Sequence, residues 1–260
     1  MPILSLSWPQ WATAGLAAVL VGLTKAGFGA GAGILVVPLM AVTLGAERML
    51  PLLLPLLLCG DVFALVHYPR QIDRRNLLIL VPGSVAGVAL GWLLLAGIVQ
   101  ARPKAVGAML DVLVGVICIV FVAIQVWRLF REAKREDRPG PYRPQAWQGA
   151  VVGVASGLTS TLSHAAGPLI TLFLLPQKLE TRVFVGTTVG YFFFANAIKL
   201  VPYSFQGLFT APILGTSLVL MPAVVVGTWA GLALNRNVPG RAFILVVYGL
   251  TLASGIKLLL

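Results

Sequence analysis

Long apolar segments separated by short polar loops dominate this chain. Each of the six longest can form a helix that crosses the hydrocarbon core of a membrane, a distance of roughly 30 Å that needs about 20 residues. They lack the alternation of apolar and polar positions that a lipid-facing β-barrel shows. The pattern predicts an all-α polytopic membrane protein with spans at residues 49–66, 77–99, 105–127, 183–201, 208–234 and 242–260.

Two further apolar segments are interrupted by runs of small residues. The first run extends from Gly22 to Gly33 and the second from Gly157 to Gly167, and both begin with Gly-Leu-Thr. The apolar stretches on either side of the first run, 11–24 and 33–44, are each too short for a full crossing. Broken backbone within a membrane must be buried in protein or face a water-filled cavity. Paired breaks in the two halves of a chain therefore point to the binding site of a transporter.

A second set of matches supports an internal repeat. Pro82, Gly87 and Gly91 in the first half have the same spacing as Pro222, Gly227 and Gly231 in the second half. Small residues at every fourth position let helices approach closely, so packing is the expected role of these glycines. The repetition itself indicates duplication.

These matches divide the chain into two repeats. We predict a first repeat at 1–127, with a broken hairpin at about 11–44, and a second repeat at 147–260, with a hairpin at about 147–175. The strongly basic segment 128–146 is the linker between them. Each broken segment either crosses the membrane once, which gives halves of the same orientation, or forms a re-entrant hairpin, which gives halves of opposite orientation.

Loop charge distinguishes these two topologies, because Lys and Arg concentrate in cytoplasmic loops. The inverted arrangement places 13 of them inside and 3 outside, whereas the other arrangement places 9 inside and 7 outside. Lys257, near the outer end of the last span, is a mild exception. The charges favour two inverted repeats, each a broken re-entrant helical hairpin plus three transmembrane helices, with a cytoplasmic linker and both termini periplasmic.

Composition excludes several classes of function. With 58% hydrophobic and only 10% charged residues, the chain is not an ordinary water-soluble domain. Its net charge of +11 arises mostly in the loops, so it reflects topology and not nucleic-acid binding. Cys59 and Cys118 lie within spans without metal-site spacing. Catalytic-triad spacing and the HExxH, CxxC and Walker motifs are absent from the sequence, so we expect no enzyme activity, cofactor or metal.

The tips of the two broken segments form the predicted binding site. If the hairpins enter from opposite faces, their tips meet near the midplane, where free N–H groups and positive helix ends suit an anion. Ionisable residues within a membrane are costly and usually functional. The predicted substrate-binding set is Lys25, Gly27, Gly29, Gly31, Gly33, Ser160, Thr161, Ser163, His164, Gly167, Tyr191 and Asn196.

Asp61 is the predicted proton carrier, with His164 as a second candidate. Asp61 lies inside its span and corresponds to Asn196 at the same separation that relates the starts of the two glycine runs, which suggests two sides of one site. The alternative roles are a structural ion pair between Asp61 and Lys25, and a neutral His164 bonded to a backbone carbonyl. For Lys25 itself, a side chain that reaches to the membrane interface is the alternative.

Three other ionisable residues within or near the spans have expected structural roles. Asp111 shares a helix face with Gly107 and Gly115, so we expect it to bond a neighbouring helix. Lys199 and His67 lie near span ends, where we expect their polar groups to extend toward the membrane interface.

The glycine motifs resemble those of a known family. GLTKAGFGAGAG at residues 22–33, followed by ILVVP, and the second copy from Gly157 to Gly167, followed by PLI, are similar to the sulfite exporter TauE/SafE family of bacterial membrane permeases. The resemblance covers nearly the whole chain. It implies two repeats with central broken helices that move sulfite, sulfoacetate or other sulfur-containing or organic anions, often with protons. Ser163 and His164 stand where the family commonly has glycine.

We therefore expect a secondary transporter (permease) for a small anion, sulfite or an organosulfonate, in the bacterial inner membrane. Its expected partners are the anion, protons and the lipid bilayer, and a homodimer is an open alternative. A passive anion channel, a permease for carboxylates or other sulfur compounds, and an intramembrane enzyme or structural component are the alternative functions.

Overall fold

The computed structural model describes residues 2–27, 35–68, 70–101, 105–133, 142–234 and 241–260. Within these ranges the structure is helical and contains no strand. The helices are α1 (Trp8–Gly27), α2 (Val36–Leu44), α3 (Ala46–His67), α4 (Arg74–Ala101), α5 (Val106–Ala133), α6 (Ala146–Ser163), α7 (Gly167–Leu174), the 3-10 helix η3 (Leu175–Gln177), α8 (Thr181–Phe205), α9 (Ala211–Leu234) and α10 (Arg241–Leu259).

Five helices in the described ranges are long and apolar enough to cross a membrane, namely α3, α4, α5, α8 and α9. Helix α10 covers the sixth predicted segment. Large apolar side chains such as Val66, Leu93 and Trp229 are exposed on the outside of the protein, whereas several charged and polar side chains are buried inside it. An apolar exterior of this kind fits contact with lipid. The prediction of an all-α polytopic membrane protein is confirmed.

Each broken segment consists of a long arm and a short arm. Helix α1 has 20 residues and α2 has 9, while α6 has 18 and α7 has 8. The first arm is thus longer than the segment 11–24 expected from the sequence. It begins before Trp11, with Pro9 in its first turn, where proline is tolerated, and it continues through Gly27.

Glycine contacts determine the two closest helix pairs, α1 with α9 and α4 with α6. A methyl group on Gly227 of α9 would lie 2.0 Å from the carbonyl oxygen of Val19 in α1, and one on Gly87 of α4 would lie 2.1 Å from that of Val154 in α6. Only glycine permits this approach, because the two backbones are themselves in contact. The packing role predicted for the repeated glycines is confirmed. Helix α1, the first arm of the first predicted repeat, thus packs against α9 of the second repeat. In the same way, α6, the first arm of the second repeat, packs against α4 of the first.

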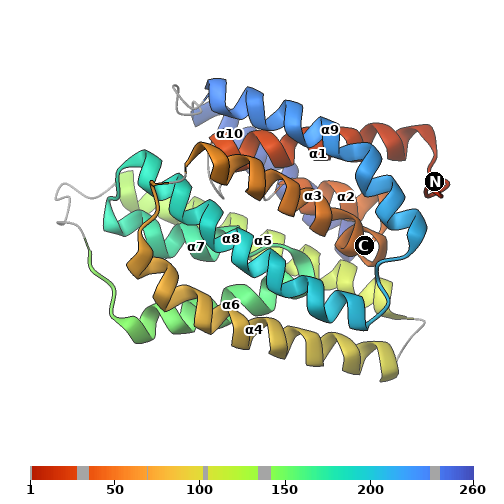
Figure 1. Ribbon diagram of the computed structural model, residues 1–260, viewed down its shortest axis with the longest axis horizontal. Coiled ribbons are helices and arrows are strands. Elements are labelled where there is room, and N and C mark those ends of the chain that lie inside the picture. The colour runs from red at the N-terminus through yellow and green to blue at the C-terminus, as the bar shows by residue number, and fades with distance from the viewer. Residues whose placement is uncertain (1, 28–34, 69, 102–104, 134–141, 235–240) are drawn as a thin grey trace.

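Equivalent helices of the two halves run in opposite directions (Figure 1). Helix α4 runs from left to right in this view, and its counterpart α9 runs from right to left. The end of α3 and the beginnings of α4, α6 and α8 lie together at the left end of the protein. The flanks of the basic loops at 68–76 and 176–182 therefore share one end, as the inverted arrangement requires. The relation of that end to a membrane stays a prediction.

Candidate functional site

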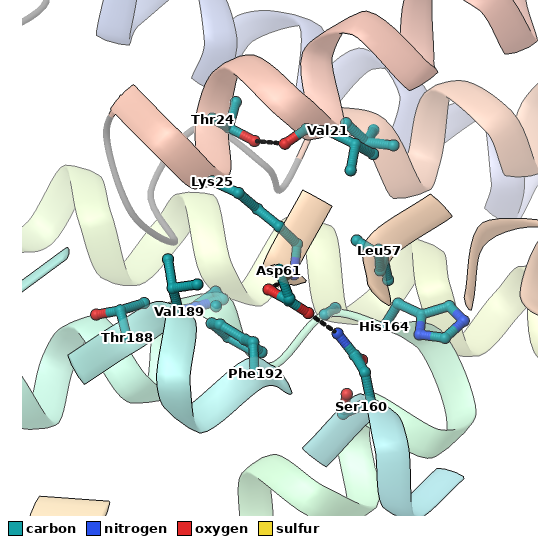
Figure 2. Close-up of a pocket in the computed structure, with 15 residues that line it drawn as sticks. Val21, Thr24, Lys25, Leu57, Asp61, Ser160, His164, Thr188, Val189 and Phe192 are labelled. Atoms are coloured by element: carbon teal, nitrogen blue, oxygen red, sulfur yellow. Dashed lines mark hydrogen bonds and ion pairs between the residues drawn. The ribbon is translucent and has the colours of Figure 1, made fainter. Parts of the chain in front are cut away.

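A cavity of about 60 Å³ lies where the two broken segments approach each other (Figure 2). It is lined by residues of α1, α2, α3, α6, α7 and α8 and of the break between α6 and α7. Its polar lining residues are Thr24, Lys25, Asp61, Ser160, His164, Thr188 and Asn196. Because one water needs roughly 10–15 Å³, the cavity has room for a few waters or one small oxyanion.

One side of the cavity is formed by a buried ion pair. Lys25, in the last turn of α1, donates from Nζ to Asp61 Oδ1 on α3, and Asn196 on α8 donates from Nδ2 to Asp61 Oδ2 at 2.7 Å. Both carboxylate oxygens therefore accept hydrogen bonds, which fits the ionised form of Asp61. Asp61 is fully buried. Lys25 Nζ also lies 5.3 Å from the centre of the Phe192 ring, close enough for a cation–π interaction.

Beside the cavity lies a second buried cation, Lys199 of α8, which is 0% exposed. Its Nζ donates to the carbonyl oxygen of Ser160 at 3.2 Å and to Ser160 Oγ at 2.8 Å, and it lies 2.8 Å from His164 Nδ1. An ammonium group has three N–H donors, and these three acceptors match them. Ser160 Oγ accepts from Lys199, so its own hydroxyl hydrogen can point toward a ligand in the cavity.

The protonation of His164 follows from its two partners. His164 Nε2 lies 2.9 Å from the carbonyl oxygen of Leu50, which can only accept, so Nε2 carries a hydrogen. Nδ1 then accepts from Lys199, and the imidazole is neutral beside an ammonium group. Moving the shared proton to His164 would leave Lys199 neutral. In either form the pair carries one positive charge.

His164 also ends α6 in a conformation that usually belongs to glycine. Its φ of 52° and ψ of 16° are left-handed, and its backbone N–H donates to the carbonyl oxygen of Ser160 at 3.0 Å. A left-handed residue commonly ends a helix, but a non-glycine residue there is strained by roughly 1–3 kcal/mol. The strain is offset by the side-chain contacts to α3 and α8, so the break in α6 positions an imidazole where a glycine would place nothing.

A tyrosine hydroxyl holds the end of each long arm. Tyr68 donates to the carbonyl oxygen of Ala26 near the end of α1 at 3.0 Å, and Tyr203 donates to that of Thr161 near the end of α6 at 2.7 Å. The two pairs are related by the same sequence separation as the starts of the two glycine runs. The last carbonyls of a helix have no partner within it. The ends of α1 and α6 are therefore held by the same kind of contact.

With Lys25, Lys199 and Asp61 in their ionised forms, the groups around the cavity sum to one net positive charge. Lys25 and the Lys199–His164 pair contribute one positive charge each, and Asp61 contributes one negative charge. The second short arm, α7, begins at the cavity with Gly167 and Pro168 and has no side-chain cap. The N-terminus of a helix carries a partial positive charge. A buried site with this balance of charge attracts an anion.

The comparison with known families agrees with this architecture. The sulfite exporter TauE/SafE family matches residues 14–258. The chain belongs to this family. As a TauE/SafE protein it is a multi-pass membrane protein of a transporter family. Searches of curated proteins and of solved structures find no match to the chain.

The cavity of this TauE/SafE protein contains several residues from both predicted tips. Lys25, Ser160, His164, Gly167 and Asn196 line it, together with the predicted proton carrier Asp61. The alternatives considered for Asp61 and His164 also describe real contacts, since Asp61 pairs with Lys25 and His164 contacts a backbone carbonyl.

Other predicted residues lie elsewhere. Three of the predicted residues do not line the cavity as far as the structure describes it, namely Thr161, Ser163 and Tyr191. Thr161 and Ser163 donate to carbonyl oxygens within α6, those of Gly157 and Thr159. The Tyr191 hydroxyl contacts Ser84 on α4 and Ser156 on α6, which joins three packed helices. Gly27 is the last residue of α1, and Gly29, Gly31 and Gly33 lie outside the described residues.

Two ionisable residues outside the cavity have defined contacts. Asp111 Oδ1 of α5 accepts from the backbone N–H of Ala46, in the first turn of α3, at 2.8 Å. This contact satisfies a donor that has no partner within its own helix. His67 is exposed, and its Nδ1 lies 3.0 Å from the carbonyl oxygen of Phe63, one turn earlier.

The sequence interpretation missed Lys199. The expectation that its side chain extends to the membrane interface was wrong, because the residue is completely buried against the end of α6. A signal was present, since Lys199 lies three residues after Asn196 and so shares a helix face with it. Thr188, which was also missed, lines the cavity and is 1% exposed, and its hydroxyl has no hydrogen-bond partner among the described residues.

Proposed function

We propose that this protein is a secondary transporter that moves a small anion, sulfite or an organosulfonate such as sulfoacetate, across the bacterial inner membrane together with protons. The observation that supports this function best is the buried net positive charge beside a cavity of oxyanion size. Buried ions are expensive, and one positive charge without a partner is best explained by a negatively charged ligand.

In this proposal Lys25 contacts the anion directly, whereas Lys199 lies behind the residues that line the cavity and attracts the anion only electrostatically. Lys25 lines the cavity and has one acceptor, Asp61, so it retains N–H groups for an anion oxygen. Lys199 does not appear among the lining residues, and its three N–H groups are used by Ser160 and His164. Ser160, held by Lys199, presents its hydroxyl to the same anion.

The Lys25–Asp61 pair offers a simple coupling step. A proton on Asp61 removes the negative charge that competes with the substrate for Lys25. The ammonium group is then free to face the anion, and the site attracts it more strongly. A doubly charged anion and a proton on Asp61 therefore assist each other in binding, and loss of either weakens the other. This reciprocity follows from linkage between two binding equilibria.

Transport in proteoliposomes tests this function against a passive channel. With a pH difference across the vesicle membrane and no initial anion gradient, a proton-coupled transporter accumulates labelled sulfite or sulfoacetate. Collapse of the pH difference with a protonophore abolishes this accumulation. A purely passive current that never exceeds the anion gradient contradicts the proposal and supports the channel.

Replacement of Lys25 with alanine tests the site itself. We expect the variant to lose most anion binding, measured by calorimetry on purified protein. Because Asp61 would then be buried without its cation, the variant is also expected to be destabilised, by about 3–5 kcal/mol. The double change Lys25→Ala with Asp61→Asn should recover thermal stability without recovering binding. Unchanged binding in the single variant would remove Lys25 from the site.

The proposed topology places the basic linker in the cytoplasm and both termini in the periplasm. Cysteine or epitope tags at each end, probed in intact cells, should react with membrane-impermeant reagents. A tag in the linker at 128–146 should be protected. A C-terminal tag that is protected in intact cells contradicts this topology.

A further inference from the structure

The charged groups around Asp61 determine how much negative charge on a bound anion the site can neutralise. From α1, Asp61 faces Lys25, and from α8 it faces Asn196 and, one turn further along, Lys199. His164 approaches from the end of α6 and is linked to Lys199. Helix α9, which also packs against α3, contains no ionisable side chain. Helix α5 also packs against α3, and its Asp111 contacts the first turn of α3 at Ala46. The total of one positive charge therefore counts Lys25, Asp61 and the Lys199–His164 pair.

The total charge of the site has two values, which depend on Asp61 alone. We assign one positive charge to the Lys199–His164 pair, because three acceptors surround Lys199 Nζ, as an ammonium group requires, and His164 Nε2 donates to the Leu50 carbonyl. Lys25 is cationic in the observed ion pair. With Asp61 ionised the site carries one net positive charge, and with Asp61 protonated it carries two.

When an anion is bound in a site buried among apolar residues, the complex is most stable if the charges of the anion and of the site cancel. An unpaired buried ion costs several kcal/mol, and the cavity wall includes Val21, Leu57 and Phe192. One net positive charge matches a monoanion, and two match a dianion. The geometry thus links the charge of the anion to the protonation of a single carboxyl group.

We propose that the site accepts one net negative charge in each binding event, either a monoanion alone or a dianion together with one proton on Asp61. This inference rests on the proposed function and specifies its substrate class. Alkanesulfonates and hydrogen sulfite belong to the first kind. Sulfite in its dianionic form, thiosulfate and sulfoacetate belong to the second. Asp61 acts here as a specificity-determining residue, because its charge selects the valence of the anion.

Proton uptake on binding measures this property directly in the unmodified protein. Purified protein in detergent is titrated in a weakly buffered solution with a pH indicator, at a pH where the probes are fully ionised. Methanesulfonate is the monoanionic probe, and thiosulfate is the dianionic probe. We expect about one proton to be taken up for each thiosulfate bound and close to none for each methanesulfonate. Equal proton uptake with the two probes would overturn the inference.

The Asp61→Asn variant tests the assignment to this carboxyl group. It fixes the site at two positive charges, so thiosulfate should bind without proton uptake and should remain bound as the pH is raised, whereas thiosulfate binding to the unmodified protein weakens. Asp111→Asn is the matched control, because it removes a carboxylate from α5 but retains an acceptor for Ala46. We expect this control to keep the proton uptake of the unmodified protein.

The possible failures are distinguishable. If Asp61→Asn still takes up a proton with thiosulfate, the proton resides elsewhere and the inference is overturned, while the anion site stands. If neither probe binds the unmodified protein and neither sulfite nor sulfoacetate is transported, the proposed function itself fails. If Asp61→Asn does not fold, the comparison of the two probes in the unmodified protein still decides the question of valence.

Discussion

Replacement of Lys199 with methionine removes one buried positive charge and keeps an unbranched side chain that fits the same space. The charge does not touch the cavity, so its effect on an anion is electrostatic. Lys199 Nζ lies 2.8 Å from Ser160 Oγ. An anion oxygen that accepts from this hydroxyl would lie about 2.8 Å further, which places the two charges at most about 5.6 Å apart.

The size of the effect follows from this distance. With an effective dielectric constant of about 20, two unit charges at that separation attract each other by about 3 kcal/mol. This energy corresponds to a dissociation constant roughly 100-fold larger in the variant. The variant also leaves His164 Nδ1 without its donor, which should lower the free energy of unfolding by about 1–3 kcal/mol. The Ser160 carbonyl keeps the hydrogen bond from the His164 backbone N–H.

Calorimetric titration with methanesulfonate measures the affinity, and thermal unfolding of the same samples measures stability. Lys199→Arg should retain most of the affinity, because it keeps the charge. Lys257→Met removes the same charge from the exposed end of α10 and should change neither quantity. A folded Lys199→Met protein whose affinity stays within about threefold of the unmodified protein, equivalent to less than about 0.7 kcal/mol, would refute the electrostatic role of this lysine.

Three further variants have defined outcomes. Tyr203→Phe removes the donor to the end of α6 and should lower the free energy of unfolding by about 1–3 kcal/mol. Its control, Tyr142→Phe, changes an exposed hydroxyl and should have little effect on thermal unfolding. Equal losses of stability in the two variants would contradict the capping role of Tyr203. Gly227→Ala should prevent folding or strongly lower the melting temperature, because its methyl group would meet a carbonyl oxygen at 2.0 Å, while Gly97→Ala meets nothing within 4 Å and should be tolerated. Asn196→Asp adds a second carboxylate to the site and lowers its net charge to zero, so sulfite binding measured at neutral pH should weaken and recover as the pH falls; binding that is independent of pH would exclude this effect.

Much of the architecture could be predicted along the chain. Apolar segments of sufficient length mark the spans, and the spacing of Gly87 and Gly227 marks the close helix pairs, because these properties depend on local composition and period. The separation between the two glycine runs also related Asp61 to Asn196, which form a hydrogen bond across the site. Equivalent positions of two repeats come together only where they lie close to the axis that relates the repeats, and the contact between Asp61 and Asn196 is of this kind.

The tertiary structure decided which polar groups converge. The position of Lys199 near the end of its predicted span suggested a side chain that extends to the membrane interface, but α8 turns this face toward the end of α6, where Ser160 and His164 bind the ammonium group. Thr161 and Ser163 belong to the predicted tip, yet their hydroxyls donate to carbonyls within α6. The rotation of each helix about its axis decides these outcomes, and it depends on packing against helices distant in the sequence.

The chain by itself determined the helical class, the paired breaks and the inventory of charges. Only the assembled structure showed that Lys25 and Asp61 line one buried cavity and that Lys199 lies directly behind its wall, which is the basis for the net positive charge assigned to the site. Hydrophobicity and charge are properties of single residues, so they can be assigned directly from the amino-acid sequence. The balance of charge in a cavity is a property of groups brought together, and it arises only when close helix packing excludes the water that would otherwise separate them.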